Sequence, residues 1–374
     1  MTARKILFFG KFTGFAGGIE RYAFQTASLL RKRGARVDWC GGIPVRGEEL
    51  FRRGFDAVLS PEDLFQDHTD YDLAALHKLP DPAVLSRLRA RFGERLVFWA
   101  HDHDLYCPRR HYYTPFGRIN CHRAYSPFRC ALCARISSPR SWKFLRCGQT
   151  SLLRELREHP AAVLSSFMRD NLILNGFSPD LVHLVPPVIE VPGTEAPSAE
   201  SKVLRILFLG QLIRGKGADL LLDALRHLSI PWHACLAGDG SDRGMLEARA
   251  RSFGLTDRIE FTSWLTDPAP ALDACDVVVF PSRWQEPFGL SGAEGAAHGK
   301  AAVAFDVGGV REWLEDGVTG FLVPERDVSA LAEKLELLYR DPALRLRLGR
   351  AGRERIRTSF SEERFLASFQ ALMK

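Results

Sequence analysis

Residues 280–300 read FPSRWQEPFGLSGAEGAAHGK, and this stretch carries the clearest structural signal in the chain. An apolar strand is expected to end at Phe280, followed by a loop with Glu286 and Gly289 and then by a helix. Glycine at a helix start lets the first backbone N–H groups approach a ligand closely, and such a start favours anions such as a diphosphate. Glu286 in the loop and Glu294 in the helix could therefore reach opposite ends of one extended ligand.

Outward from this stretch, short apolar runs alternate with amphipathic helices, which predicts parallel sheets covered by helices on both faces. The strands expected before residue 190 are Ile6–Gly10, Val37–Cys40, Ala57–Leu59, Leu96–Ala100, Ala162–Ser165 and Leu181–Val185. Those expected after residue 200 are Arg205–Gly210, His233–Gly238, Ile259–Thr262, Val277–Phe280, Ala301–Phe305 and Phe321–Val323. Clear helical patterns cover Ile19–Lys32, Asp219–Leu228 and Glu362–Met373.

The pattern begins twice, which indicates two domains. RILFLG at 205–210 has the same form as KILFFG at 5–10, and the Pro-, Glu- and Ser-rich segment 186–202 between them is typical of a linker. A chain of 374 residues is long enough for two α/β domains. Ligands bind open parallel sheets at their carboxyl ends, so a cleft between the two sheets is the expected site. The predicted boundaries are 1–190 with an insertion at about 105–150, then 191–357, then a helical segment 358–374 that could pack back on the first domain.

The composition indicates a globular protein: 46% of the residues are hydrophobic and 26% are charged. No apolar run reaches the roughly 20 residues that a membrane span needs. The start, MTARKILFFGKF, has the pattern of a strand with a basic flank and lacks the small-residue cleavage site of a signal peptide. We therefore expect a cytoplasmic protein, with peripheral binding to the inner face of the plasma membrane as an open alternative.

Positive charge is concentrated in the first half of the chain. Residues 1–190 contain 28 Lys/Arg and 19 Asp/Glu, and residues 105–150 contain nine basic residues and no acidic one. Such an imbalance favours an anionic partner: lipid headgroups, a phosphorylated acceptor or, less readily, nucleic acid. The alternative is a basic surface that only contacts solvent.

Five motifs, in order along the chain, resemble the retaining GT-B glycosyltransferases of the family-4 type (glycosyl transferases group 1). They are GGIERYAFQTASLLRKRG at 17–34, FLGQLIRGKGADLLLDAL at 208–225, AGDG at 237–240, ACDVVVFPSRWQEPFGLSGAEGAAHGK at 274–300 and VGGVREWLEDGVTGFLV at 307–323. The resemblance covers nearly the whole chain. It implies a GT-B fold of two Rossmann-like domains that face a central cleft, with the acceptor side in the first domain and the nucleotide-sugar in the second.

The resemblance also implies roles for the residues of the opening stretch. Glu286 would meet the sugar hydroxyls of the donor and Glu294 the ribose hydroxyls. The backbone of the three residues Phe288, Gly289 and Leu290 would face the phosphates. An alternative for Glu294 is purely structural, because Ser291 followed three residues later by glutamate is also a capping-box pattern.

Lys216, in RGKG, is similar to the family's phosphate-binding lysine. A fixed cation can stabilise the charge that develops on a departing nucleotide diphosphate without a metal ion. The family usually has arginine five residues earlier, where this chain has Gln211, and Arg214 is the nearby candidate to replace it. The alternative is that Lys216 is an ordinary surface lysine.

Two features of the first half also resemble the family. Gly17 and Gly18 are similar to its glycine loop near the donor phosphates and the acceptor, although a glycine pair could serve only the turn. His101, directly after an expected strand, is similar to the histidine that contacts the donor sugar. Because His101 is followed by Asp102, His103 and Asp104, metal ligation by this segment stays an alternative.

Four cysteines in the insertion, Cys107, Cys121, Cys130 and Cys133, suit a tetrahedral structural zinc site, with free thiols as the alternative and Cys147 as another ligand. Aromatic residues interleave with arginines in the same segment, a pattern that suits a membrane interface, a lipid-diphosphate acceptor or stacking on single-stranded nucleic acid. These aromatic residues are Tyr106, Tyr112, Tyr113, Phe116, Tyr125, Phe128 and Trp142.

Taken with the resemblance, these features predict a retaining, metal-independent transfer of a sugar from a UDP- or GDP-sugar. The expected acceptor is a saccharide or a lipid-linked molecule in the synthesis of a surface polysaccharide or glycoconjugate. The leaving phosphate would itself help to take the acceptor proton. Two other functions stay open: a nucleotide-sugar-binding module without activity, and a zinc-ribbon nucleic-acid binder.

Overall fold

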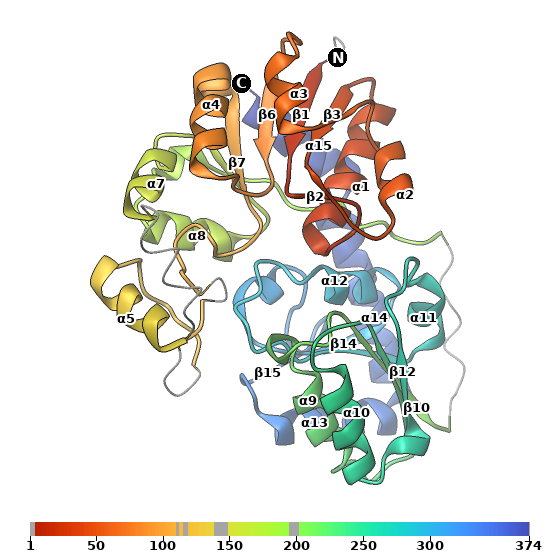
Figure 1. The fold of residues 1–374 in the computed structure, drawn as a ribbon. Coiled ribbons are helices and arrows are strands. Elements are labelled where there is room, and N and C mark those ends of the chain that lie inside the picture. The colour runs from red at the N-terminus through yellow and green to blue at the C-terminus, as the bar shows by residue number, and fades with distance from the viewer. Residues whose placement is uncertain (1–3, 110–111, 115–118, 138–148, 194–201, 374) are drawn as a thin grey trace. The chain divides into compact units, whose positions relative to one another are not determined.

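The computed structural model describes residues 4–109, 112–114, 119–137, 149–193 and 202–373 (Figure 1). The chain divides into two compact units, which we call unit 1 (Met1–Val188 with Glu362–Lys374) and unit 2 (Ile189–Ser361). In the part of the chain that the structure describes, no helix combines the length and the apolar character needed to cross a bilayer.

Unit 1 is built on a seven-stranded sheet in the order β5-β3-β1-β6-β7-β8-β9, and all neighbouring strands are parallel. Its strands are β1 (Lys5–Phe9), β3 (Arg36–Cys40), β5 (Val58–Leu59), β6 (Leu73–Leu76), β7 (Leu96–Ala100), β8 (Ala161–Val163) and β9 (Val182–Leu184). The short strands β2 (Phe12–Thr13) and β4 (Ile43–Pro44) pair separately. Strand β6 was missed in the sequence, because LAAL contains only residues that are typical of helices.

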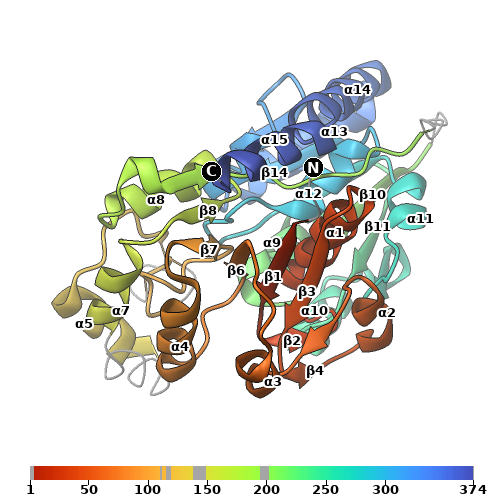
Figure 2. The ribbon, with the colours of Figure 1, turned by 90° about the horizontal axis from the view of Figure 1, so that it is seen from above.

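The helices of unit 1 lie between these strands in the chain, as a parallel sheet requires, except for the last one, which follows the strands of unit 2. They are α1 (Gly18–Lys32), α2 (Glu48–Arg53), α3 (Pro61–Gln66), α4 (Pro82–Phe92), α5 (Pro127–Ser137), α7 (Gln149–Leu156), α8 (Ser166–Leu174) and α15 (Glu362–Leu372). Figures 1 and 2 both place α5, α7 and α8 on the side of β7 and β8, away from α1 and α2. Helix α15 packs on the same unit, where the ring of Phe369 lies 6.0 Å from that of Trp99.

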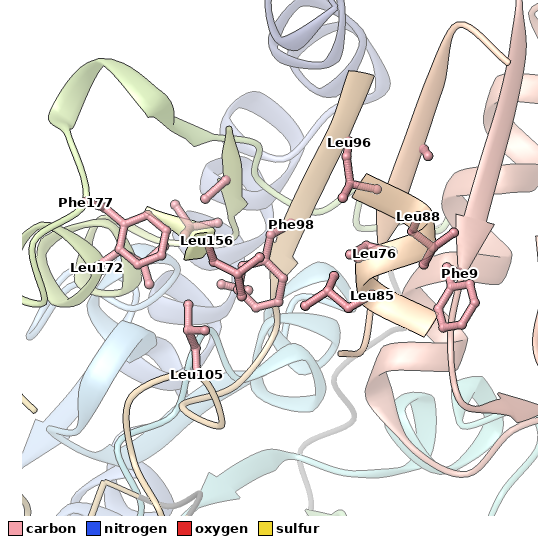
Figure 3. Close-up of a cluster of buried hydrophobic side chains, with 14 of the residues drawn as sticks. Phe9, Leu76, Leu85, Leu88, Leu96, Phe98, Leu105, Leu156, Leu172 and Phe177 are labelled. Carbon is pink, nitrogen blue, oxygen red and sulfur yellow. The ribbon is translucent and has the colours of Figure 1, made fainter. Parts of the chain in front are cut away.

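One buried cluster ties strands β1, β6 and β7 to helices α4, α7 and α8 (Figure 3). The labelled members are Phe9, Leu76, Leu85, Leu88, Leu96, Phe98, Leu105, Leu156, Leu172 and Phe177. The start of the insertion belongs to this cluster, since Tyr106, Cys107 and Tyr112 are buried in it. The insertion is therefore anchored in the core of unit 1 and is more than a surface loop.

Unit 2 has a six-stranded parallel sheet in the order β12-β11-β10-β13-β14-β15. Its strands are β10 (Leu204–Leu209), β11 (Trp232–Ala237), β12 (Ile259–Thr262), β13 (Val277–Phe280), β14 (Ala301–Phe305) and β15 (Gly320–Val323). Its α-helices are α9 (Ala218–Leu225), α10 (Arg243–Ser252), α11 (Ala269–Ala274), α12 (Leu290–Ala297), α13 (Val328–Arg340) and α14 (Pro342–Ser359). Two Rossmann-like units with parallel sheets confirm the predicted GT-B class.

Candidate functional site

In unit 2, the loop after β13 brings the two expected site residues Lys216 and Glu286 into direct contact. The Lys216 ammonium lies 2.8 Å and 3.0 Å from the two carboxylate oxygens of Glu286. The Ser282 hydroxyl donates to the same carboxylate at 2.5 Å. Glu286 is only 5% exposed, so the contacts with Lys216 and Ser282 stabilise its buried carboxylate. A paired cation and a buried carboxylate therefore stand together at the carboxyl end of the sheet.

Two glycines hold the RGKG turn against this loop. A Cβ on Gly215 would lie 1.7 Å from the indole of Trp284, and one on Gly217 would lie 1.8 Å from the carbonyl oxygen of Pro281. Gly217 also has φ +75°, a conformation that other residues rarely adopt. The buried Arg283 guanidinium bonds the carbonyl of Arg214 at 2.8 Å. Because no other residue fits at positions 215 and 217, these two glycines fix the position of Lys216 between them.

Helix α12 begins at Leu290, and Gly289, with φ +92°, is its N-cap without a side-chain hydrogen bond. Ser291 lies inside the helix, so the capping-box explanation of Glu294 is wrong. The Phe288 side chain is buried, which leaves only its backbone for a ligand. The first N–H groups of α12 have few internal partners, as an anion site requires.

The turn before α12 is supported by the segment after β14, through residues that were not singled out from the sequence. The indole N–H of Trp313 donates to the Phe288 carbonyl at 2.9 Å. The side chain of Gln285 accepts from the Gly308 amide at 3.0 Å. Gly308 and Trp313 lie in the VGGVREWL motif, and Ser282 and Gln285 lie in the opening stretch, so their signal was present but unassigned.

Arg214 does not join the Lys216–Glu286 pair. Its side chain is exposed and makes no hydrogen bond to any residue that the structure describes, although its carbonyl accepts from Arg283. Gln211, at the family's usual arginine position, is partly exposed. The prediction that Arg214 replaces the missing arginine therefore stays a prediction.

In unit 1, the glycine pair stands at the start of α1: Gly17 is the N-cap and Gly18 the first helical residue. The buried carboxylate of Glu20 accepts a hydrogen bond from the Gly17 amide. Burial raises the pKa of Glu20, while the amides of Glu20 and Gly17 act in the opposite direction. The Glu20 carboxylate thus already compensates part of the partial positive charge at the N-terminus of α1.

His101 follows β7 and meets His77, which follows the neighbouring strand β6. Nδ1 of His77 and Nε2 of His101 are 2.8 Å apart. Burial, together with the nearby Lys78 ammonium, lowers the pKa of His101 to about 3. His101 is therefore neutral at physiological pH. The sequence analysis missed His77 together with its strand.

The two aspartates beside His101 are bound to a lysine. The Lys78 ammonium contacts the carboxylates of Asp102, at 2.5 Å, and Asp104. His103 instead bonds the Tyr106 hydroxyl at 2.6 Å inside the core. Lys78 thus stands where a metal ion would have to bridge the carboxylates, which argues against metal ligation by this segment.

None of the four insertion cysteines forms a disulfide bond with a residue that the structure describes. The Cys107 sulfur accepts the backbone N–H groups of Arg109 and Tyr112, and that of Cys130 accepts the Ser126 amide at 3.4 Å. Among residues 4–109, 112–114, 119–137, 149–193 and 202–373, no group of three or more His, Cys, Asp or Glu is arranged to hold a metal ion. Cys147, Phe116 and Trp142 lie outside the described residues. The zinc site therefore stays a prediction.

The chain is similar to known glycosyltransferases. Residues 195–355 match the family model "Glycosyl transferases group 1". The chain is 33% identical to Alpha-D-kanosaminyltransferase of Streptomyces kanamyceticus over 38% of each chain. It is 27% identical to 2-deoxystreptamine glucosyltransferase of the same organism over 80% of this chain and 74% of that one. The chain thus spans well under half the length of the first of these relatives.

A solved structure extends the likeness to the whole fold. Anabaena Alr3699/HepE, crystallised with UDP and glucose, aligns with a TM-score of 0.77 over 99% of both chains at 18% identity. At that identity the likeness shows the fold alone. Residues 195–355 therefore match the Glycosyl transferases group 1 family model, within a chain that has the GT-B fold.

Proposed function

We propose that this protein is a retaining, metal-independent glycosyltransferase that moves a sugar from a UDP- or GDP-sugar to a saccharide or lipid-linked acceptor. The observation that carries the proposal is the contact of Lys216 with the buried Glu286 carboxylate, beside the glycine-started helix α12. The names of the relatives point the same way, since both are transferases of sugars. Synthesis of a surface polysaccharide or glycoconjugate is the proposed setting.

The proposed chemistry gives these groups the roles that the family resemblance implies. The N–H groups at the start of α12 bind the diphosphate, and Glu294 binds the ribose. The Lys216 cation stabilises the negative charge that grows on the leaving phosphate, while Glu286 orients the sugar hydroxyls. The leaving phosphate helps to accept the proton of the attacking hydroxyl on the same face of the sugar. For His101 we propose a hydrogen bond to the transferred sugar.

Binding and turnover with nucleotide-sugars test the proposal. The full chain is incubated with UDP-glucose, UDP-galactose, UDP-N-acetylglucosamine and GDP-mannose, and both thermal stabilisation and slow hydrolysis are recorded, with and without EDTA. We expect one of them to stabilise the protein and to be hydrolysed equally in EDTA, with the released sugar initially in the α configuration. Stabilisation without turnover, even with acceptors, indicates a binding module. No stabilisation together with tight RNA binding would overturn the proposal.

We also propose that α5 contacts an anionic membrane surface. Phe128 is 83% exposed and Leu132, one turn along, is 54% exposed, while Arg129 lies between them. Exposed apolar side chains among arginines suit a lipid interface. Flotation with vesicles of anionic or neutral lipid tests this: the double variant F128E/L132E should lose the anionic preference, and L50E, at an exposed position in α2, should keep it. Equal flotation on both lipids would contradict the proposal.

For the four insertion cysteines we propose a structural zinc ion and no catalytic metal. The support is their spacing, together with the backbone N–H groups directed at the sulfurs of Cys107 and Cys130; burial raises the pKa of both thiols, and these donors act against that rise. Elemental analysis of the purified protein should find about one zinc per chain, and C130S/C133S should lose it. A metal-free wild-type protein with unchanged stability would leave four ordinary thiols.

A further inference from the structure

Two histidines stand side by side at the carboxyl end of the unit 1 sheet. His77 is the first residue after β6, His101 is the first after β7, and these strands are neighbours. Their rings are nearly parallel, 24° apart, with centroids at 5.1 Å. With 2.8 Å between His77 Nδ1 and His101 Nε2, one of these nitrogens carries the shared proton and the other accepts it.

We infer that His77 is a positioning residue, which donates from Nδ1 to His101 Nε2 and so fixes His101 in the tautomer with its own proton on Nδ1. In that tautomer His101 presents a hydrogen-bond donor to a ligand. Its second nitrogen is occupied as an acceptor, so His101 does not act as a general base. The ligand's identity rests on the proposed function, whereas the tautomer does not.

The direction of the bond follows from the surroundings of His77. Its other nitrogen, Nε2, is buried and has no hydrogen-bond partner among the described residues. Aromatic rings surround the His77 ring, with centroid-to-centroid distances of 4.5 Å to Phe8, 5.3 Å to Trp99, 6.0 Å to Tyr22 and 6.3 Å to Trp39. The indole nitrogen of Trp39 is likewise buried without a partner in the described part of the chain, and it can only donate.

A setting made of donors and apolar rings favours a bare lone pair on Nε2 of His77. A proton there would be one more buried N–H without an acceptor, and such donors are rarer in proteins than under-used acceptors. The proton of neutral His77 must then lie on Nδ1, which faces His101. Both rings are neutral, because burial lowers the pKa of each.

The remaining nitrogen of His101 is available. Among the described residues, the side chain of His101 makes one hydrogen bond, the one to His77. Its Nδ1 is not one of the buried polar atoms that lack a hydrogen-bond partner there. The edge of its ring meets Tyr22 at 5.0 Å, and the Lys78 ammonium adds positive charge nearby. A hydrogen-bond acceptor, such as a ligand oxygen, is the partner that this N–H requires.

The tautomer can be read directly in the full-length protein. Long-range ¹H–¹⁵N correlation spectra of protein labelled in its histidine rings distinguish protonated from bare ring nitrogens, and the His101 signals are assigned by their loss in H101F. We expect protonated Nδ1 and bare Nε2 in both histidines from pH 5.5 to 8.5. A protonated Nε2 on His101 would overturn the inference, whatever the activity.

Three variants connect the tautomer to turnover. H77F keeps an aromatic ring but removes the donor, and should let His101 shift to the Nε2 tautomer and lower kcat at least 10-fold. H77N restores an N–H near the position of Nδ1 and should recover kcat to within about 3-fold of wild type. H183F, at a partly exposed histidine in β9, is the matched control and should change neither. If H77F lowers kcat without altering the His101 tautomer, the inference fails, whereas absent turnover in wild type with the expected tautomer refutes the proposed function alone.

Discussion

We expect the indole of Trp313 to contribute more to the stability of unit 2 than its packing alone would provide. W313F removes the hydrogen bond to the Phe288 carbonyl and opens a gap beside Gly292, where the indole lies 2.3 Å from the position of a Cβ. The loss of packing costs about 1–2 kcal/mol, and the broken hydrogen bond with its orphaned buried carbonyl adds about 1–3 kcal/mol. We therefore expect a total loss of about 2–5 kcal/mol.

Trp232 provides the matched control. It is also buried in the same unit, but its indole N–H has no hydrogen-bond partner among the described residues. W232F should therefore lose stability only through poorer packing and a weaker contact with Arg258, whose guanidinium lies 4.4 Å from the ring centroid. That amounts to about 1–2 kcal/mol. The difference between the two variants isolates the hydrogen bond that holds the turn before α12.

Hydrogen exchange followed by mass spectrometry measures the two costs within unit 2. The slowest amides of β13 and β14 report the free energy of opening this sheet, independently of unit 1. W313F should also speed exchange at the start of α12 and weaken binding of the preferred nucleotide-sugar. Equal losses for W313F and W232F, with unchanged exchange at residues 288–292, would refute the argument that Trp313 holds this turn.

Three further predictions use single substitutions. K216M should lower kcat/KM at least 100-fold in a hydrolysis or transfer assay, because it removes the charge facing the leaving group; a loss below 5-fold would contradict that role. G217A should lower the melting temperature far more than G254A, because both glycines have positive φ but only a Cβ on Gly217 would strike Pro281; similar melting curves would contradict the fit of the RGKG turn. The pKa of His101 is about 3 in the folded protein and about 6.5 unfolded, so the unfolded state binds more protons between these values and stability falls as pH drops below 6.5. H101F should reduce this slope in urea titrations by at most about 1.4 kcal/mol per pH unit, and an unchanged slope would mean that His101 takes up its proton when folded.

The sequence was most informative where the site residues are close together in the chain. In unit 2, the strand that ends at Phe280, the turn and the helix follow one another in the chain, and the glycines that shape them can be identified in the sequence. Gly217 and Gly289 stand where their positive φ angles are required. Lys216 and Glu286 are 70 residues apart, but each belongs to a motif of its own, so both could be predicted. What the sequence could not provide is the contact between them, which depends on how the two loops pack.

Unit 1 was harder because its polar cluster is assembled by sheet order. The strands that precede His77 and His101 are neighbours in the sheet. The two histidines that follow these strands therefore lie next to each other. The weak strand pattern of LAAL hid β6, and with it both His77 and Lys78. Without Lys78 the pair Asp102 and Asp104 was open to interpretation as metal ligands, and only the structure shows that an ammonium binds both. Had β6 been recognised, the rule that parallel strands meet at their carboxyl ends would have predicted a histidine pair there, because each of these two strands is followed at once by histidine.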